Sequence, residues 1–133
     1  MAANVERGEL DVENLGNQEV RTLRFQTSAL LLLEEQLGQD VMSYVANRGG
    51  QTKFLVAAIY AGLSNNRDKK LTPIRIAGWL DTYQGSRVDL QKSILLAIAR
   101  GKPGEEGQEM YRILKEHFGE EEDGAAVPPS KAG

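Results

Sequence analysis

Residues 53–63 read KFLVAAIYAGL, a run that is apolar on most sides of a helix. Its main apolar stripe consists of Leu55, Ala58, Ile59, Gly62 and Leu63. The stripe is widened around the helix axis by Phe54, Ala57 and Ala61. A helix of this kind is usually central to its domain, because each apolar face must be covered. The segment therefore predicts a central helix with the rest of the chain packed around it.

The sequence before this helix begins with an alternating pattern. Leu10 and Val12 alternate with acidic residues, and Leu23 and Phe25 alternate with polar or basic ones. Between them, NLGN at residues 14–17 has the composition of a turn. Alternation on both sides of a turn predicts a β-hairpin over about residues 8–26. Since a lone hairpin is marginal in water, it is expected to pack on the helices.

A helical period begins directly after the hairpin. Thr27 or Ser28 is expected to cap this helix, and Gly38 is expected to end it. Its expected core positions are Leu30, Leu33 and Leu37. Asp40 is expected to cap a second, short helix, which Gly49 and Gly50 stop. These two helices connect the hairpin to the central helix.

Two further helices are predicted beyond a polar loop. Thr72 can cap the first, and Pro73 suits its first helical position. Gly85 is expected to end it, and Ser86 with Asp89 three residues later forms a capping box for the second. The expected core positions are Ile76, Trp79, Leu80, Tyr83, Leu90, Ile94, Ala97 and Ile98, with Gly101 and Pro103 closing the second helix.

A last helix is predicted over residues 106–118, with one face formed by Met110, Ile113, Leu114 and Phe118. The sequence after it holds four consecutive acids at 120–123, then paired prolines, and has no core-forming period. Residues 119–133 are therefore expected to be a disordered acidic tail, after one domain that spans residues 1–118. The predicted fold class is mainly α, a small helical bundle with an N-terminal β-hairpin.

Composition narrows the class of protein. The chain has 133 residues, a formal charge of -3 and no cysteine. This length suits one domain whose core needs neither metal nor disulfide. Without cysteine there is no disulfide, thiolate nucleophile or cysteine zinc site. The start of the chain lacks the apolar core of a signal peptide, and no apolar run is long enough for a membrane span. These features predict a cytoplasmic protein that binds neither membrane nor nucleic acid.

The residues that could carry catalysis lack the neighbours that catalysis needs. His117, the only histidine, is interpreted as a partly exposed residue at the edge of the last helix. Carboxylates fall mostly in runs such as Glu34–Glu35 and Glu105–Glu106, which are typical of solvated surfaces. GKPG at residues 101–104 follows a helix, and its proline removes an amide donor that a phosphate loop needs. We expect no enzyme activity, no cofactor and no metal site.

A basic cluster and a set of aromatic residues are the candidates for binding a partner. One basic cluster could contact phosphates, but it contains Asp68 and no aromatic residue, so a solvated loop is favoured; it consists of Arg67, Lys69, Lys70 and Arg75. Trp79 and Tyr83 share an apolar helix face, which favours a place in the core. As aromatic side chains with some exposure, Trp79, Tyr83 and Tyr60 are still the candidate anchors for a protein partner.

Several short strings, taken in order, resemble a known family. They are RF at 24–25, TSALLLLEE at 27–35, FLVAAIYAGL at 54–63, LTP at 71–73, WLD at 79–81 and IARG at 98–101. Over about residues 10–101, this order resembles the tail assembly chaperones of long-tailed bacteriophages and of gene transfer agents. The helix predicted over residues 106–118 departs from the family pattern.

The resemblance implies a protein of the host cytoplasm that is absent from the mature virion. Such chaperones bind the tape measure protein, a long helical chain that would otherwise aggregate, while tail tube subunits polymerise around it. The implied partners are therefore the tape measure protein and, as a further contact, the tail tube protein, with self-association also open. Many such chaperones have a second, longer form made by a programmed frameshift. Helix-in-groove recognition is the natural mode for a helical client.

Two other classes stay open. One is a structural virion component, such as a head-tail connector or tail terminator, which would be found in purified particles. The other is a DNA-binding regulator with a helix-turn-helix, in which residues 72–87 and the helix after them would contact DNA. The second class needs a basic recognition helix, whereas residues 86–100 carry only Arg87, Lys92 and Arg100, with Asp89 among them.

Overall fold

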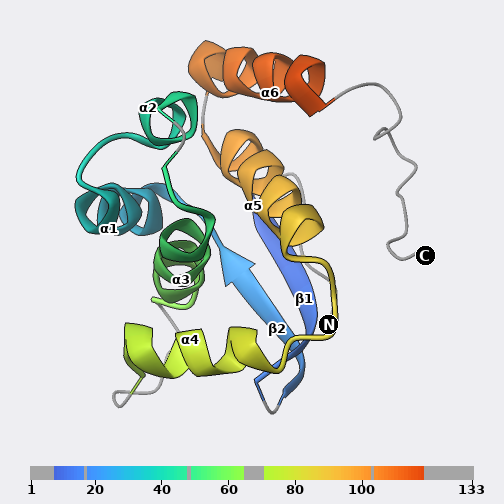
Figure 1. The fold of residues 1–133 in the computed structure, drawn as a ribbon. Helices are drawn as coiled ribbons and strands as arrows, with labels where there is room; N and C mark the ends of the chain where they lie inside the picture. Colours follow the sequence, from blue (N-terminus) through green and yellow to red (C-terminus); the bar gives the residue numbers. More distant parts are fainter. Residues whose placement is uncertain (1–7, 17, 48, 65–70, 103, 119–133) are drawn as a thin grey trace.

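The computed structural model describes residues 8–16, 18–47, 49–64, 71–102 and 104–118. These residues are mainly helical and begin with a two-stranded hairpin, which confirms the predicted fold class (Figure 1). The elements are, in order, β1 (Glu9–Leu15), β2 (Gln18–Arg24), α1 (Thr27–Leu37), α2 (Val41–Ala46), α3 (Gln51–Gly62), α4 (Pro73–Asp81), α5 (Arg87–Gly101) and α6 (Gly104–Phe118). The predicted disorder of residues 119–133 falls on a segment outside the described residues.

The hairpin lies within the predicted residues 8–26, but its turn is shorter than the sequence predicted. β1 and β2 pair antiparallel, with Leu10 opposite Leu23 and Leu15 opposite Gln18. Asn14 has a φ of 58°, a left-handed conformation that asparagine tolerates better than most residues. This interrupts the alternation of faces, so Val12 and Leu15 are both buried although three positions separate them. Residues 14–17 therefore do not all belong to the turn, and Leu15 belongs to the core.

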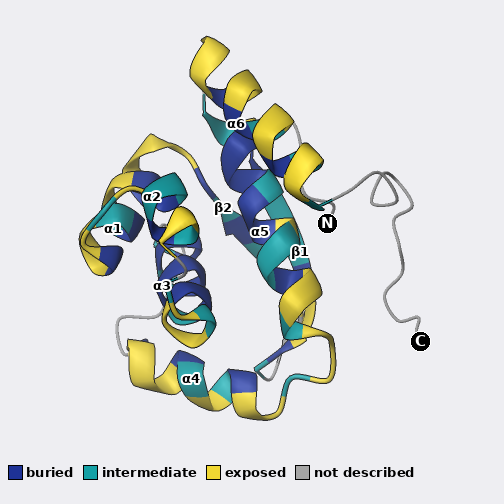
Figure 2. Cartoon of the chain, turned by 45° about the horizontal axis from the view of Figure 1, so that its top comes forward, coloured by how far each residue is buried: buried dark blue, intermediate teal, exposed yellow. Residues whose placement is uncertain are grey.

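The helix predicted to be central is central. α3 packs against α1, α4, α5 and β2, and its buried residues cover most of its circumference (Figure 2). The predicted stripe and its extensions are buried along their full length: Phe54, Leu55, Ala57, Ala58, Ile59, Ala61, Gly62 and Leu63. Among the described residues, no polar or charged residue is buried, so this core is held by apolar packing alone.

The helix caps follow the sequence in most places. Asp40 Oδ1 accepts the Ser43 amide at 2.9 Å, and Ser86 Oγ accepts the Asp89 amide at 3.1 Å. Thr72 Oγ1 caps α4, and Pro73 takes the first helical position, as predicted. Gly38 ends α1 with a φ of 80°, which a glycine adopts without strain.

The start of α1 and the end of α4 differ from the prediction. α1 begins at Thr27 itself, and Gln26 stands at the capping position without a side-chain hydrogen bond. The prediction assumed that a hydroxyl must cap the helix, whereas the Phe25–Gln26 connection leads directly into it. α4 ends at Asp81, four residues before Gly85, because the amides of Thr82 and Tyr83 turn back to the carbonyls of Trp79 and Leu80.

α4 and α6 lie at opposite ends of the molecule. α4 crosses the turn end of the hairpin, whereas α6 lies across α5 at the far end (Figures 1 and 2). Met110 and Leu114 are buried against α5, as predicted, but Ile113 is 40% exposed and does not share their face fully. Gly107 brings the two helices close, since a Cβ there would lie 2.2 Å from the Lys102 carbonyl oxygen.

Gly101 does more than end a helix. A Cβ on Gly101 would lie 2.5 Å from the Phe25 carbonyl oxygen, and one on Gly8 would lie 2.7 Å from the Gly101 Cα. The two glycines therefore let the start of the hairpin and the end of α5 approach at backbone distance. The Phe25 amide donates to the Gly8 carbonyl at 3.0 Å, which holds the hairpin ends at this junction.

Candidate interaction surface

The side chain of Trp79, a residue of α4, lies against the hairpin turn. The guanidinium of Arg21 is 3.9 Å from the centre of the indole ring, and Arg21 Nε also donates to the Leu15 carbonyl oxygen at 2.6 Å. A Cβ on Gly16 would be only 2.9 Å from Trp79 Cε2, so the turn backbone lies directly against the ring. Trp79 is therefore packed in part against the protein's own hairpin and remains partly exposed.

Tyr83 is also largely engaged within the molecule. It follows α4, is half-buried, and packs against the core. Burial raises the pKa of Tyr83 above its ordinary value, and the negative charges of Asp89 and Glu13 raise it further. The phenol thus stays protonated and neutral at physiological pH. Its ring lies close to Gly85, where a Cβ would be 2.6 Å from the hydroxyl oxygen.

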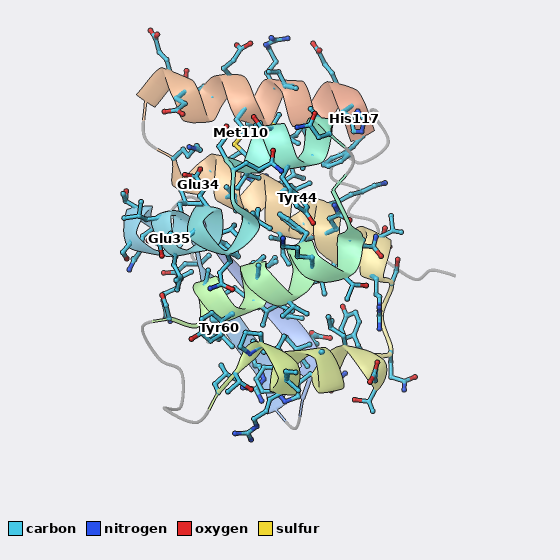
Figure 3. All side chains as sticks on the ribbon, turned by 60° about the vertical axis from the view of Figure 1, so that its left-hand side comes forward. Glu34, Glu35, Tyr44, Tyr60, Met110 and His117 are labelled. Carbon is cyan, nitrogen blue, oxygen red and sulfur yellow. The ribbon has the colours of Figure 1, made fainter. Side chains whose placement is uncertain are left out.

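Tyr60 comes from a different element, the outward edge of α3 (Figure 3). It is half-buried, as is Val56 one turn earlier, while Thr52 and Lys53 on the same side are exposed. Tyr60 therefore belongs to the strip of α3 that its neighbouring helices do not cover completely. The three aromatic residues predicted as partner anchors come from two helices and the segment after α4, and each is partly packed on the core.

An open groove lies between the ends of three helices. Its volume is about 280 Å³, and its walls are formed by Val45 of α2, Val88 and Leu95 of α5, and Phe118 of α6, with Gln91, Lys92 and His117 beside them. This volume lies at the lower end of the range of about 300–1,000 Å³ that is usual for small-molecule pockets. Its walls come from positions between 45 and 118, so no single helix pattern in the sequence could indicate the groove.

The polar residues of the groove carry no negative charge. Lys92 Nζ lies 5.5 Å from the centre of the Phe118 ring, and no carboxylate of the described residues forms an ion pair with it. Gln91 accepts a hydrogen bond from Gln51 at 3.0 Å, which ties α5 to the start of α3. The groove thus combines four apolar side chains with three polar ones, of which Lys92 is a cation.

The residues considered for catalysis lie apart. His117 is exposed at the end of α6, where its ring contacts Phe118, while Glu34 and Glu35 lie on α1 (Figure 3). In the part of the chain that the structure describes, no group of three or more histidine or acidic side chains could hold a metal ion. Most of the basic cluster, residues 67–70, lies outside the described residues; Arg75 is exposed on α4.

No described helix is both long and apolar enough to cross a membrane. Comparison with family models, with curated proteins and with solved structures gives no match to the chain.

Proposed function

We propose that this chain is a protein-binding chaperone of phage tail assembly, whose client is the helical tape measure protein. The observation that carries the proposal is the open groove between the ends of α2, α5 and α6, which presents Val45, Val88 and Phe118 beside polar side chains. Grooves of this kind bind one face of an amphipathic helix, with apolar contacts at the centre and charged contacts at the rim. The identity of the client is supported by the resemblance of residues 10–101 to tail assembly chaperones.

The helix-turn-helix alternative has less support. The three cations of α5 each engage a group within the protein: Arg87 donates to the Leu80 carbonyl, Arg100 to the Tyr111 hydroxyl, and Lys92 lies over Phe118. Binding DNA needs basic side chains that are free to contact phosphates. The virion-component alternative shares the expectation of protein binding and differs only in whether the chain stays in the particle.

Co-expression tests the proposal. The tape measure protein encoded in the same genome is produced alone, with the wild-type chain, or with an unrelated small acidic helical protein. We expect the soluble fraction of the tape measure protein to rise only in the culture that also produces the wild-type chain, because this chain covers apolar helix faces that otherwise aggregate. An equal soluble fraction in all three cultures would contradict the chaperone proposal. Finding the chain at stoichiometric amounts in purified particles would favour the virion component.

A further inference from the structure

The last helix, α6, packs mainly on one neighbour. Among the described elements that neighbour is α5, whereas the central helix α3 packs against α1, α4, α5 and β2. The buried residues of α6 are Gly107, Met110 and Leu114, which are three and four positions apart and form one stripe. The rest of the helix is largely exposed (Figure 2). α6 is therefore an amphipathic helix that is held on the molecule by a single face.

The ion pairs of α6 lie within the helix itself. Arg112 pairs with Glu109 and with Glu116, so these contacts stay intact wherever the helix lies. A hydrogen bond from Arg100 of α5 to the Tyr111 hydroxyl, 2.9 Å long, joins the two helices and is exposed to water. Exposed polar contacts stabilise little, because water competes for the same groups. The apolar stripe is thus the main contact that holds α6 on α5.

The side of α5 beneath α6 continues into the groove. Leu95, which lines the groove, is 2% exposed, and Ala99, four positions later on the same side, is 1% exposed. A Cβ on Gly107 of α6 would lie 2.9 Å from the Ala99 carbonyl oxygen, so α6 covers this side at close range. At its other end α6 contributes Phe118 to the groove wall. The groove and the seat of α6 therefore lie on one continuous side of α5.

The groove is small for a helix while α6 stays in place. Its volume is about 280 Å³. Two turns of helix with their side chains form a cylinder about 10 Å wide and about 11 Å long, which is several times larger. A client helix that follows the apolar side of α5 from the groove toward Ala99 therefore takes the place of α6.

The connection between the two helices offers a pivot. α5 ends at Gly101, and α6 begins at Gly104, whose φ of 71° is a left-handed conformation that does not continue a helix. A Cβ on Gly104 would contact nothing beyond the adjoining backbone, so the described elements do not pack on this point. The resemblance to tail assembly chaperones also ends at about residue 101. α6 can therefore turn away from α5 at this point while the rest of the described fold stays in place.

We propose that α6 is an autoinhibitory helix: it occupies the side of α5 on which the helical client binds, and the client binds by displacing it. The inference rests on the proposed function and adds the regulation of the same site. Because a short connection keeps α6 at a high effective concentration beside α5, a competing helix must offer the larger apolar contact. The free chain is thereby closed to short helices of other proteins.

A peptide with the sequence of residues 104–118 tests the displacement without the client. It carries a fluorophore, and its binding to the full chain is measured by fluorescence anisotropy. Leu114→Ala weakens the hold of α6 on α5, so the peptide should bind this variant about tenfold more tightly than wild type, or tighter still. Ile113→Ala is the matched control: Ile113 is 40% exposed, so binding should stay within about threefold of wild type. Circular dichroism checks that both variants keep their fold.

A crosslink gives the opposite test and leaves the apolar stripe intact. The chain has no cysteine, so Arg100→Cys and Tyr111→Cys introduce the only thiols, and a bismaleimide then joins α5 to α6. We expect the crosslinked chain to bind the peptide about tenfold more weakly, or weaker still, than the same variant with both thiols capped by a monomaleimide. Equal binding by the crosslinked and capped chains would overturn the inference. So would a Leu114→Ala variant that binds the peptide no better than Ile113→Ala.

The crosslinked and capped chains also separate this inference from the proposed function. If the tape measure protein co-purifies equally with both chains, the proposed function stands and the autoinhibition is wrong. If it co-purifies with neither while the peptide behaves as described, α6 is displaceable and the named client is wrong. Co-purification with the capped chain alone supports both.

Discussion

The guanidinium of Arg21 lies over the indole ring of Trp79, at 3.9 Å from its centre, and joins the hairpin to α4. The same side chain donates to the Leu15 carbonyl oxygen, so it also closes the hairpin turn. Cation–π contacts that are partly shielded from water stabilise by about 0.5–2 kcal/mol. This contact helps to hold α4, which packs on α3 through Ile76 and Leu80, across the turn end of the hairpin, and it gives Trp79 a structural role.

Replacing Arg21 by alanine should lower the free energy of unfolding by about 1–2 kcal/mol, because both the ring contact and the hydrogen bond are lost. Urea unfolding followed by the fluorescence of Trp79, the only tryptophan, measures this. Arg112→Ala is the control, since Arg112 pairs only with exposed Glu109 and Glu116 on α6 and should change stability by less than about 1 kcal/mol. Equal effects of the two variants would contradict the role given to Arg21.

Ile59 and Leu31 are a second matched pair. Ile59 is 0% exposed in the central helix, and Leu31 is 64% exposed on α1. Ile59→Ala should cost about 2–5 kcal/mol through lost burial and a remaining cavity. Leu31→Ala should cost less than about 0.5 kcal/mol. Denaturant titration measures both, and a cost below about 1 kcal/mol for Ile59→Ala would show that α3 is not packed as described.

Much of this fold could be predicted from the sequence because the deciding signals are local. The stripe around Ile59, the caps at Asp40, Thr72 and Ser86, and the glycine at 38 each act within one turn of helix. The helical elements and most of the core follow from them.

The remaining features depend on contacts between distant segments. The burial of Leu15 depends on the left-handed Asn14, which the alternation pattern could not show. The partial covering of Trp79 depends on Arg21, fifty-eight positions earlier in the chain. The groove combines residues of α2, α5 and α6. The pattern within a single helix therefore indicated the aromatic residues and could not indicate that Val88 lies at a groove.

Gly78 offers a test of how α4 is packed. It lies in the middle of α4, is exposed, and a Cβ added there would contact nothing beyond the backbone of its own helix. Gly78→Ala should therefore raise the free energy of unfolding by about 0.5–1 kcal/mol. Gly107→Ala should instead be destabilising, because its Cβ would lie 2.2 Å from the Lys102 carbonyl oxygen. Thermal melts of both variants check the opposite signs, and a destabilised Gly78→Ala would mean that the outer face of α4 is covered.

The cap at Asp40 predicts a dependence on pH. Hydrogen bonds from the Ser43 amide and hydroxyl lower the pKa of Asp40 below its ordinary value of about 3.9. A carboxyl whose pKa is lowered by folding stabilises above the unfolded-state pKa, and this stabilisation is lost as pH falls through the folded-state pKa. Asp40→Ala should cost about 1 kcal/mol at neutral pH and less in acid. Thr72 is the control, because the side chain that caps α4 carries no charge. The cost of Thr72→Ala, measured by urea titration at neutral and at acidic pH, should not change with pH.

The proposed binding of a tape measure protein can be measured by co-purification. The tagged chain and the tape measure protein from the same genome are co-expressed, captured at low and at high salt, and analysed by size exclusion. We expect a complex that persists at high salt, because apolar contacts at the centre of a helix-binding groove are not screened by ions. Val88→Asp, at the groove, should weaken this complex, whereas Ile74→Asp, exposed on α4 away from the groove, should not. A tape measure protein that never elutes with the wild-type chain, at any salt concentration, would contradict the account.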